Sequence, residues 1–317
     1  MNIKLKMNIK YIRYIIVLTT SLMFGRDTIG EGLYEDELIN YLRDNYKTSY
    51  TLNYDDARDA MYSDYDNISG VVSGVYTNFS VNNVPYNDPR PTVHNGGLNC
   101  EHVWPQSMYS GTSPMKSDLH HLRPAKSNVN SSRGNKPYNE IADSETDNWY
   151  WLNYSNSSIP SSNINEYSES KSGNFEPRED RKGDVARAIF YFYTIYNNVA
   201  DEDFFNTQKD VLYEWHNQDP VTDSEINRTW QIASYQNNIP NPFIVDESLI
   251  YRAYFFNTQL GDANLDSIVN VVDVVLLVSY IFGESDLSEE QFSNADIDNN
   301  SIINVSDIIA LIDIILS

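Results

Sequence analysis

The sequence predicts an α+β fold followed by a small all-α module, and three observations support this. Apolar residues recur at helical spacing in several segments. Residues 70–81 (GVVSGVYTNFSV) are rich in the β-branched and aromatic side chains typical of strands. Residues 261–317 instead hold two similar acidic stretches, each followed by an apolar helix pattern. A chain of 317 residues is long enough for one large core and a smaller appended module.

The N-terminus has the pattern of a secretory signal peptide. Residues 14–24 form an apolar stretch that is too short to span a bilayer comfortably. We expect residues 1–30 to be removed, with cleavage between Gly25 and Glu31, and the mature protein to be secreted without a membrane span; a buried N-terminal helix is the alternative. Export brings no disulfide framework, because Cys100 is the only cysteine. The basic residues before the apolar stretch are Lys4, Lys6, Lys10 and Arg13.

Residues 31–258 form the first predicted domain. Residues 184–197 are apolar around most of the helix circumference, so we expect a buried helix with Asp184 as its N-cap. Loops are predicted over residues 82–97 and 155–173, which are rich in Asn, Pro, Ser and Gly. The other predicted helices cover residues 34–46, 54–65, 223–235 and a segment from about Asp210 to just before Pro220.

The charge of the chain is strongly negative but unevenly distributed. The formal net charge is −23, which is unfavourable for contact with nucleic-acid phosphates. Residues 261–317 contain eleven Asp and Glu and no Lys or Arg, so nearly half of that charge lies there. Residues 101–140 have five basic and three acidic side chains, a local balance of +2. The overall acidity therefore does not exclude nucleic-acid binding by the first domain.

The two acidic stretches, residues 262–273 and 296–307, align as twelve-residue loops 34 residues apart. Both place oxygen-bearing side chains at positions 1, 3, 5, 9 and 12, with a backbone carbonyl at position 7. This is the pattern that a hard cation needs, so we expect each loop to bind one Ca²⁺. The expected ligands are Asp262, Asn264, Asp266, Ile268, Asn270 and Asp273 in the first loop and Asp296, Asp298, Asn300, Ile302, Asn304 and Asp307 in the second.

With Asp at position 12 and a helix after each loop, residues 259–317 resemble a type I dockerin, a domain of paired calcium loops and helices. Ser267 and Ser301 depart from the family, which usually has Gly at position 6. The resemblance implies two bound Ca²⁺ ions and a partner protein that carries a cohesin. It also implies that partner choice depends on loop positions 10 and 11, here Val271, Val272, Val305 and Ser306.

Three segments within residues 98–140 contain the groups that phosphodiester hydrolysis needs. These groups are a base that activates water and a cation that neutralises the phosphate. His102 is the natural base near neutral pH. The Glu101 carboxylate and an Asn amide oxygen form an incompletely filled oxygen site that suits Mg²⁺ with several waters retained. The segments are residues 100–105 (CEHVWP), 117–124 (SDLHHLRP) and 128–135 (NVNSSRGN).

In order and spacing, these segments resemble the bacterial endonuclease I family, whose core is a ββα-metal (His-metal-finger) motif. The resemblance covers roughly residues 34–256. It implies a ββα-metal finger nuclease domain with additional helices, which cleaves DNA without strong sequence choice and leaves 5′-phosphate ends. Whether RNA is also a substrate stays open at this point. The other matching stretches are YLRDNY, YDDARDAMYSDYDN, GVYT, FEPREDRKGDVARAIFYFYT, LYEWHNQDPVTDSEINR and YQNNIPNPFI.

By motif position, the resemblance assigns His102 as general base and Glu101 and Asn130 as Mg²⁺ ligands. Arg133, one turn beyond Asn130, is expected to hold the scissile or product phosphate. Cys100 departs from the family, which commonly has Arg before the motif Glu. We interpret Cys100 as a packed side chain that points away from Glu101; a reactive thiol is the alternative.

Other candidate residues each have two interpretations. If His120 and His121 lie on a strand, they face opposite sides, so at most one can be a metal ligand; both are otherwise structural. Lys126 and Lys136 are either phosphate contacts or solvated surface residues. Two other functions remain open: a catalytically inactive scaffold that retains the nuclease fold, and a metal phosphoesterase for small phosphates. The lack of further Asp and His clusters argues against the phosphoesterase.

Overall fold

The computed structural model describes residues 28–108, 111–256, 259–266 and 268–316. The chain divides into two compact units, Met1–Ile250 and Tyr251–Ser317. This division falls shortly before the boundary at residue 258 that the composition indicates. The predicted signal peptide, residues 1–30, lies outside the described residues except for its last three.

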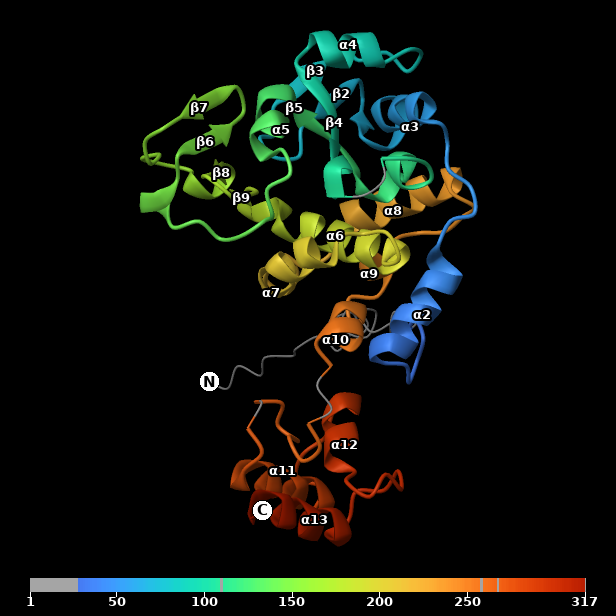
Figure 1. The fold of residues 1–317 in the computed structure, drawn as a ribbon, viewed down its shortest axis with the longest axis vertical. Helices are drawn as coiled ribbons and strands as arrows, with labels where there is room; N and C mark the ends of the chain where they lie inside the picture. The colour runs from blue at the N-terminus through green and yellow to red at the C-terminus, as the bar shows by residue number, and fades with distance from the viewer. Residues whose placement is uncertain (1–27, 109–110, 257–258, 267, 317) are drawn as a thin grey trace, which may run out of the picture. The chain divides into compact units, whose positions relative to one another are not determined.

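The first unit mixes helices with small antiparallel sheets, which confirms the predicted α+β class (Figure 1). In the described residues the sheets have the strand orders β1-β2-β3, β4-β5 and β7-β6-β8-β9. The strands are β1 Asn67–Ile68, β2 Val71–Ser73, β3 Ser80–Asn82, β4 Leu98–His102, β5 Leu122–Lys126, β6 Asn148–Trp151, β7 Tyr154–Asn156, β8 Ser168–Ser170 and β9 Phe175–Glu176. The helices are α2 Glu35–Tyr46, α3 Tyr54–Ala60, α4 Arg90–Asn95, α5 Ser127–Arg133, α6 Lys182–Tyr196, α7 Glu202–Gln218, α8 Asp223–Tyr235, α9 Pro242–Val245 and, across the division, α10 Leu249–Tyr254.

Helix α6 is the centre of the first unit's core, as its sequence predicts. Nearly all of its side chains are buried, and it packs against α2 and α7. Its Phe192 ring stacks on Trp104 with centroids 4.9 Å apart, and Tyr193 stacks on Phe205 at 3.8 Å. The prediction that Asp184 is the N-cap is wrong, because α6 begins two residues earlier. Asp184 instead forms ion pairs with arginines, among them Arg181 at 3.4 Å.

Gly183 allows α6 to approach the end of α7 closely. Its backbone N–H donates to Asp219 Oδ2 at 2.9 Å. A Cβ atom at position 183 would lie 2.0 Å from the Asp219 carbonyl oxygen. Only glycine therefore fits at this contact without a shift of the backbone.

Several predicted boundaries are wrong for identifiable physical reasons. Helix α7 begins earlier than expected, because the Asp201 side chain caps it by accepting from Phe204 N at 2.8 Å. The predicted loop 82–97 contains α4, and the predicted loop 155–173 contributes most of β7 and all of β8. Polar composition suggested loops at both places, although strand pairing and tertiary packing decided the structure. Helix α8 agrees with its prediction, and Thr222 caps it.

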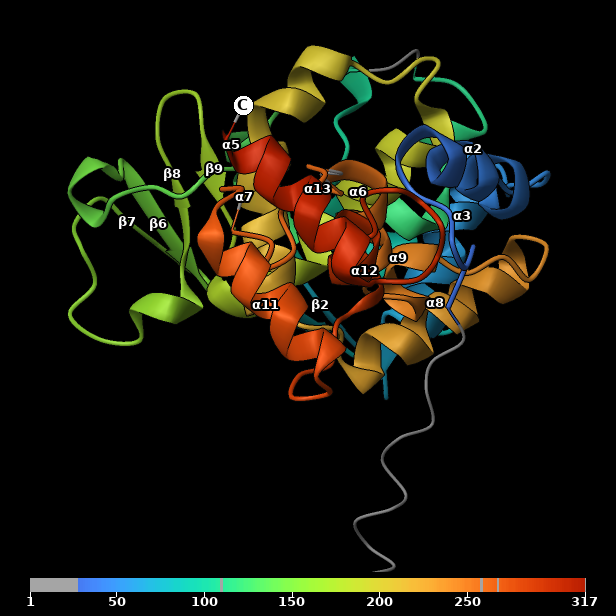
Figure 2. The ribbon, with the colours of Figure 1, turned by 90° about the horizontal axis from the view of Figure 1, so that it is seen from below.

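The second unit contains α11 Val271–Ile281, α12 Glu289–Ala295 and α13 Val305–Leu316. Helices α11 and α13 lie side by side (Figures 1 and 2). Its small buried core includes Leu277 on α11 and Leu311 on α13, which are 34 residues apart and occupy equivalent positions of the repeat. Throughout the described residues of both units, the helices lack the combination of length and apolar character needed to traverse a bilayer.

Candidate active site

Strands β4 and β5 and helix α5 form a β-hairpin followed directly by a helix, the ββα arrangement expected from the sequence. The strands are antiparallel, with Leu98 opposite Lys126 and His102 opposite Leu122. Helix α5 starts immediately after β5 and packs against both strands. It ends at Arg133, because the next residue, Gly134, has a φ of 56°, which lies outside the range of a right-handed helix. Helix α5 lies against β4 and β5 (Figure 1), and Glu101 and His102 are the last two residues of β4.

Glu101 is buried in a network of side chains from distant segments. Tyr76 Oη donates to Glu101 Oε1 at 2.7 Å, and the hydroxyl groups of Tyr76 and Tyr138 are 2.6 Å apart. Arg133 Nη1 is 3.5 Å from the same carboxylate oxygen. Burial raises the pKa of Glu101 to about 7, although Arg133 and the Tyr76 hydrogen bond oppose the shift. The carboxylate is therefore strongly desolvated, and a nearby cation would stabilise its charged form.

Arg133 is placed differently from a residue that contacts substrate phosphate. Its side chain is completely buried and donates to three backbone carbonyls, those of Val103 at 2.6 Å, Gly134 at 3.2 Å and His102 at 3.3 Å. Its guanidinium carbon also lies 4.6 Å from the centre of the Tyr138 ring. In this structure Arg133 supports the end of β4 and the Glu101 carboxylate, which corrects the expected phosphate contact.

The hydrogen bonds of His102 determine which ring nitrogen can act as a base. His102 Nε2 lies 3.1 Å from the Lys116 carbonyl oxygen, which only accepts, so Nε2 carries the proton. Nδ1 then holds the lone pair, and it accepts from Gln106 Nε2 at 3.1 Å. Burial and the neighbouring His121 lower the pKa of His102 to about 3, so the ring is neutral near pH 7. The imidazole is therefore in the form that can accept a proton.

Asn130 is oriented by its amide nitrogen. Nδ2 donates to Asn99 Oδ1 at 2.8 Å and to the Cys100 carbonyl at 3.2 Å. These bonds hold the amide nitrogen against β4 and leave the amide oxygen as the remaining polar atom of the side chain. A carboxylate oxygen and an amide oxygen are the donor types that Mg²⁺ prefers. Glu101 and Asn130 thus have the donor chemistry of the expected site.

His120 and His121 lie on a 3₁₀ helix, Leu119–His121, and not on a strand, so the argument from strand alternation is wrong. Both side chains are buried and both contact carbonyls. His120 Nε2 lies 2.9 Å from Ile239 O, and His121 Nε2 lies 2.7 Å from Met115 O. The His121 ring is 5.4 Å from that of His102. These contacts favour the structural interpretation, in which the two histidines orient the finger.

Asp118 supports the connection between β4 and β5, a role that was not predicted from the sequence. Its buried carboxylate accepts from Tyr191 Oη at 2.9 Å, Tyr196 Oη at 2.7 Å and Gln236 Nε2 at 3.0 Å. It therefore ties the connection between β4 and β5 to α6 and to the end of α8. No local pattern identifies this role, because the partners lie far away in the sequence.

The remaining candidates near the finger are mostly engaged with protein groups. Lys126 is largely buried, with its ammonium 5.1 Å from the Phe79 ring centre, and burial lowers its pKa. Lys136 donates to Ser170 Oγ at 2.6 Å. Burial raises the pKa of Cys100 to about 12, and its side chain packs against an apolar cluster. Cys100 is therefore a protonated, packed thiol, in agreement with the preferred interpretation.

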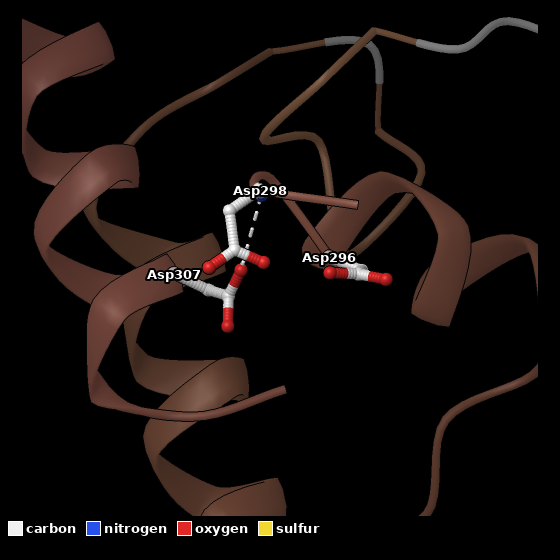
Figure 3. A group of neighbouring side chains, drawn as sticks. All are labelled: Asp296, Asp298 and Asp307. Atoms are coloured by element: carbon white, nitrogen blue, oxygen red, sulfur yellow. Dashed lines mark hydrogen bonds between the residues drawn. The ribbon is translucent and has the colours of Figure 1, made fainter. Parts of the chain in front are cut away.

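The second unit holds a separate group of acidic side chains. The carboxylates of Asp296, Asp298 and Asp307 each offer an oxygen, and these oxygens lie within 4.8 Å of one another (Figure 3). Across the described residues, this is the one group of three or more His, Cys, Asp or Glu side chains that meets this spacing. The predicted second loop is thus folded with its acidic groups together.

The two loops share their internal hydrogen bonds, which supports the 34-residue repeat. Asp273 Oδ2 accepts from Asn270 N at 2.8 Å, and Asp307 Oδ2 accepts from Asn304 N at 2.9 Å. The carbonyls of Ile268 and Ile302 each accept from the Asn two residues later, at 3.1 Å. Ser301, at the position where Gly is usual, has a φ of 64°, the left-handed conformation that glycine favours.

Comparisons with known proteins show a family match that spans most of the first unit. The sequence model of the family described as "Endonuclease I" matches residues 31–248. An extracellular ribonuclease of Bacillus subtilis (strain 168) is 36% identical over 186 residues, which cover 50% of this chain and 56% of the relative. An extracellular ribonuclease of Bacillus amyloliquefaciens is 34% identical over 165 residues, 47% of this chain and 51% of the relative. The chain thus spans about half the length of the curated relatives it matches.

Proposed function

This chain belongs to the endonuclease I family, and on that premise we propose that it is a metal-dependent nuclease that hydrolyses phosphodiester bonds of DNA and RNA without strong sequence choice. The ββα finger, with Glu101, His102 and Asn130 on adjoining parts of β4 and α5, is the observation that carries the proposal. The names of the two bacterial relatives support RNA as a substrate beside DNA.

In the proposed mechanism, His102 removes a proton from the attacking water. Lys116 O accepts from Nε2, so the proton passes to Nδ1. Gln106 Nε2 donates to the Nδ1 lone pair in this structure, so its amide has to give up that hydrogen bond when the attacking water binds to Nδ1. Arg133 holds the carbonyls of His102 and Val103 and so fixes the strand end on which the imidazole stands. The roles of base and of support thus belong to different side chains.

We assign Glu101 and Asn130 as the residues that hold a divalent cation, Mg²⁺ by preference. The fit rests on a buried carboxylate with one cationic neighbour at 3.5 Å, and on an amide whose nitrogen is fixed against β4. A cation bound there supplies charge neutralisation for the phosphate and for the departing 3′-oxygen. Departure of that oxygen leaves 5′-phosphate and 3′-hydroxyl ends.

Cleavage of supercoiled plasmid and of single-stranded RNA, each with Mg²⁺ and with EDTA, tests the proposal. We expect cleavage with Mg²⁺, none with EDTA, and a loss of at least about 10²-fold in His102→Ala. Asn130→Ala should lose activity, whereas Asn128→Ala, at an exposed position of the same helix, should retain it. Intact DNA and RNA under all conditions would instead indicate an inactive scaffold that retains the fold.

A small phosphate ester in the same assay tests the remaining alternative. A phosphoesterase for small phosphates would hydrolyse the ester and leave plasmid and RNA intact. Activity that survives His102→Ala unchanged would remove the base assignment.

We propose that the protein is secreted and that residues 1–30 are its signal peptide. The support is the basic and apolar pattern of that segment together with relatives that are extracellular. N-terminal sequencing of protein recovered from the medium should find a start between Gly25 and Glu31. Recovery of the uncleaved chain from cells alone would contradict it.

We propose that the second unit is a dockerin-like module that binds two Ca²⁺ ions and a cohesin-bearing partner. The acidic group of Figure 3 supports the ion in the second loop, and the shared hydrogen bonds extend the argument to the first. Apolar side chains at equivalent positions of α11 and α13 stay exposed, including Val271 at 65% and Val305 at 60%. An exposed apolar surface of this kind is typical of a binding site.

Titration with a purified type I cohesin tests the module. We expect binding with Ca²⁺, loss of binding with EGTA, and a large decrease when Val271 and Val305 are both changed to Asp. Asp307→Asn, which removes an expected calcium ligand, should weaken cohesin binding. Asp313→Asn, on the exposed side of α13, is its control and should not. If the module binds calcium but no cohesin, the predicted ion sites stand and the predicted partner is wrong.

A further inference from the structure

A pocket of about 330 Å³ lies beside β4 and is separate from the groups assigned above. Two arginines and a histidine line it, Arg58 on α3 and Arg90 and His94 on α4. Asn99 and Cys100 of β4 form another part of the wall. In the described residues β4 pairs only with β5, so its other edge has no strand partner.

Two aspartates hold the arginines of this pocket in place. Asp55 bridges them, with its two oxygens 2.5 Å from Arg58 Nη2 and 3.1 Å from Arg90 Nη1. Asp59 accepts from Arg90 Nε at 2.7 Å. Arg90 uses Nε and Nη1 in these contacts, and Arg58 uses Nη2 together with Nε, which donates to the Tyr54 carbonyl at 3.4 Å. The Nη2 group of Arg90 and the Nη1 group of Arg58 are then left for another acceptor. The side chains of Arg58 and Arg90 are also 29% and 30% exposed, so a ligand can reach them.

The pocket is connected to the candidate active site at two points. Asn99, in its wall, accepts the hydrogen bond from Asn130 Nδ2 at 2.8 Å. Arg58 lies 4.3 Å from the centre of the Tyr54 ring, and that ring is 5.5 Å from the His102 ring. Lys116 contacts the same tyrosine, at 4.9 Å. Arg58 and Lys116 therefore both contact Tyr54, whose ring lies beside the proposed base.

We propose that this pocket binds a phosphate of the nucleic-acid strand next to the one that is cleaved. The inference rests on the proposed nuclease function and adds a subsite to it. Guanidinium groups suit this ligand, because their fixed N–H donors match phosphate oxygens. Asp55 and Asp59 balance the charges of Arg58 and Arg90, so the remaining N–H donors of the two guanidinium groups, and not a net positive charge, are what the phosphate would bind. The small Cys100 side chain leaves room for the phosphate beside the strand.

The salt dependence of cleavage tests the subsite. The measurement is kcat/KM for a single-stranded oligonucleotide between about 50 and 200 mM salt. Arg90→Gln should lower kcat/KM at low salt and reduce the slope of log(kcat/KM) against log[salt] by about 0.7, the value for one lost phosphate contact on a single strand. Arg90 is chosen because, unlike Arg58, it has no contact with the Tyr54 ring in the structure.

Two variants serve as controls. Arg90→Lys keeps the charge and should keep the slope, and Arg43→Gln, which removes an arginine from α2, should match the wild type. If Arg90→Gln is folded and keeps the wild-type slope, the subsite is overturned. If Arg90→Gln does not fold, Arg58→Gln is measured in its place. If the wild type cleaves nothing, the proposed function fails. Fluorescence anisotropy of the labelled oligonucleotide in EDTA then gives the same comparison for binding alone.

Discussion

The two units hold their polar groups in different ways. In the second unit, the expected ligands of each cation come from twelve consecutive residues, and neighbouring backbone N–H groups orient them. In the first unit, Glu101 depends on Tyr76, Arg133 and Tyr138, which come from two segments, one on each side of Glu101 in the sequence. A site of the first kind is visible as a sequence pattern. A site of the second kind requires the folded core.

This difference predicts different sensitivities. The second unit has a small core, so we expect its stability to depend on bound ions. The first unit has a large core with buried tryptophans, tyrosines and arginines, so we expect it to fold without ions and to be sensitive to changes at distant supporting residues. All five tryptophans lie between residues 104 and 230, so tryptophan fluorescence follows the unfolding of the first unit alone.

The largest effect is expected for Arg133→Ala. The substitution leaves the buried Glu101 carboxylate and three backbone carbonyls without their cationic partner. We expect a loss of about 3–5 kcal/mol in the free energy of unfolding of the first unit. Nuclease activity should fall with it, because β4 loses its support. Urea unfolding followed by tryptophan fluorescence measures the stability. Arg181→Ala, at a partly exposed arginine, should change the free energy of unfolding little. Equal losses in Arg133→Ala and Arg181→Ala would show that Arg133 does not stabilise the buried Glu101 more than an ordinary surface arginine would.

Removal of calcium should affect only the second unit. At an ion concentration about 100 times Kd, each site stabilises the folded form by about 2.7 kcal/mol. We therefore expect EGTA to lower the melting temperature of the second unit, as seen by circular dichroism, and to leave the tryptophan transition unchanged. Asp307→Asn should reproduce much of the loss, and Asp313→Asn should not. A calcium-dependent tryptophan transition would show that the units do not differ in this way.

Gly183→Ala should destabilise the first unit by about 1–3 kcal/mol, the usual cost of overpacking. The new methyl group would overlap the Asp219 carbonyl oxygen, so α6 or the end of α7 has to move. Urea unfolding followed by tryptophan fluorescence measures the change. Ser131→Ala, at an exposed position of α5, is the control. An unchanged midpoint would mean that the contact between α6 and α7 is loose enough to adapt.

Sequence reasoning succeeded where a local pattern determines the structure. The apolar periodicity of α6, the limits of α8 and the second acidic loop were predictable, because each depends on neighbouring residues. The sheet containing β6 to β9 was missed, because its strands are only two to four residues long and β7 and β8 lie in a segment of loop-like composition, rich in Ser and Asn. The buried position of Arg133 was missed for a different reason: spacing along α5 does not reveal that Tyr138 and three carbonyls enclose the side chain.

The smallest expected effect concerns Glu169, a buried carboxylate on β8 whose Oε2 accepts a hydrogen bond from Thr146. Burial raises its pKa to about 7, whereas an unfolded chain has the ordinary value near 4.5. The folded state therefore holds a proton that the unfolded state releases, so this group lowers stability as pH rises from about 4.5 to about 7. In Glu169→Gln this contribution disappears, and the first unit should lose about 1–2 kcal/mol less stability over that range than the wild type. Urea midpoints at both ends of the range measure the difference, and Glu214→Gln, at an exposed position, should behave as the wild type. If the variant keeps the wild-type pH dependence, Glu169 is ionised in the folded protein. The first unit would then hold a negative charge at β8 beside Glu176, whose own charge disfavours it.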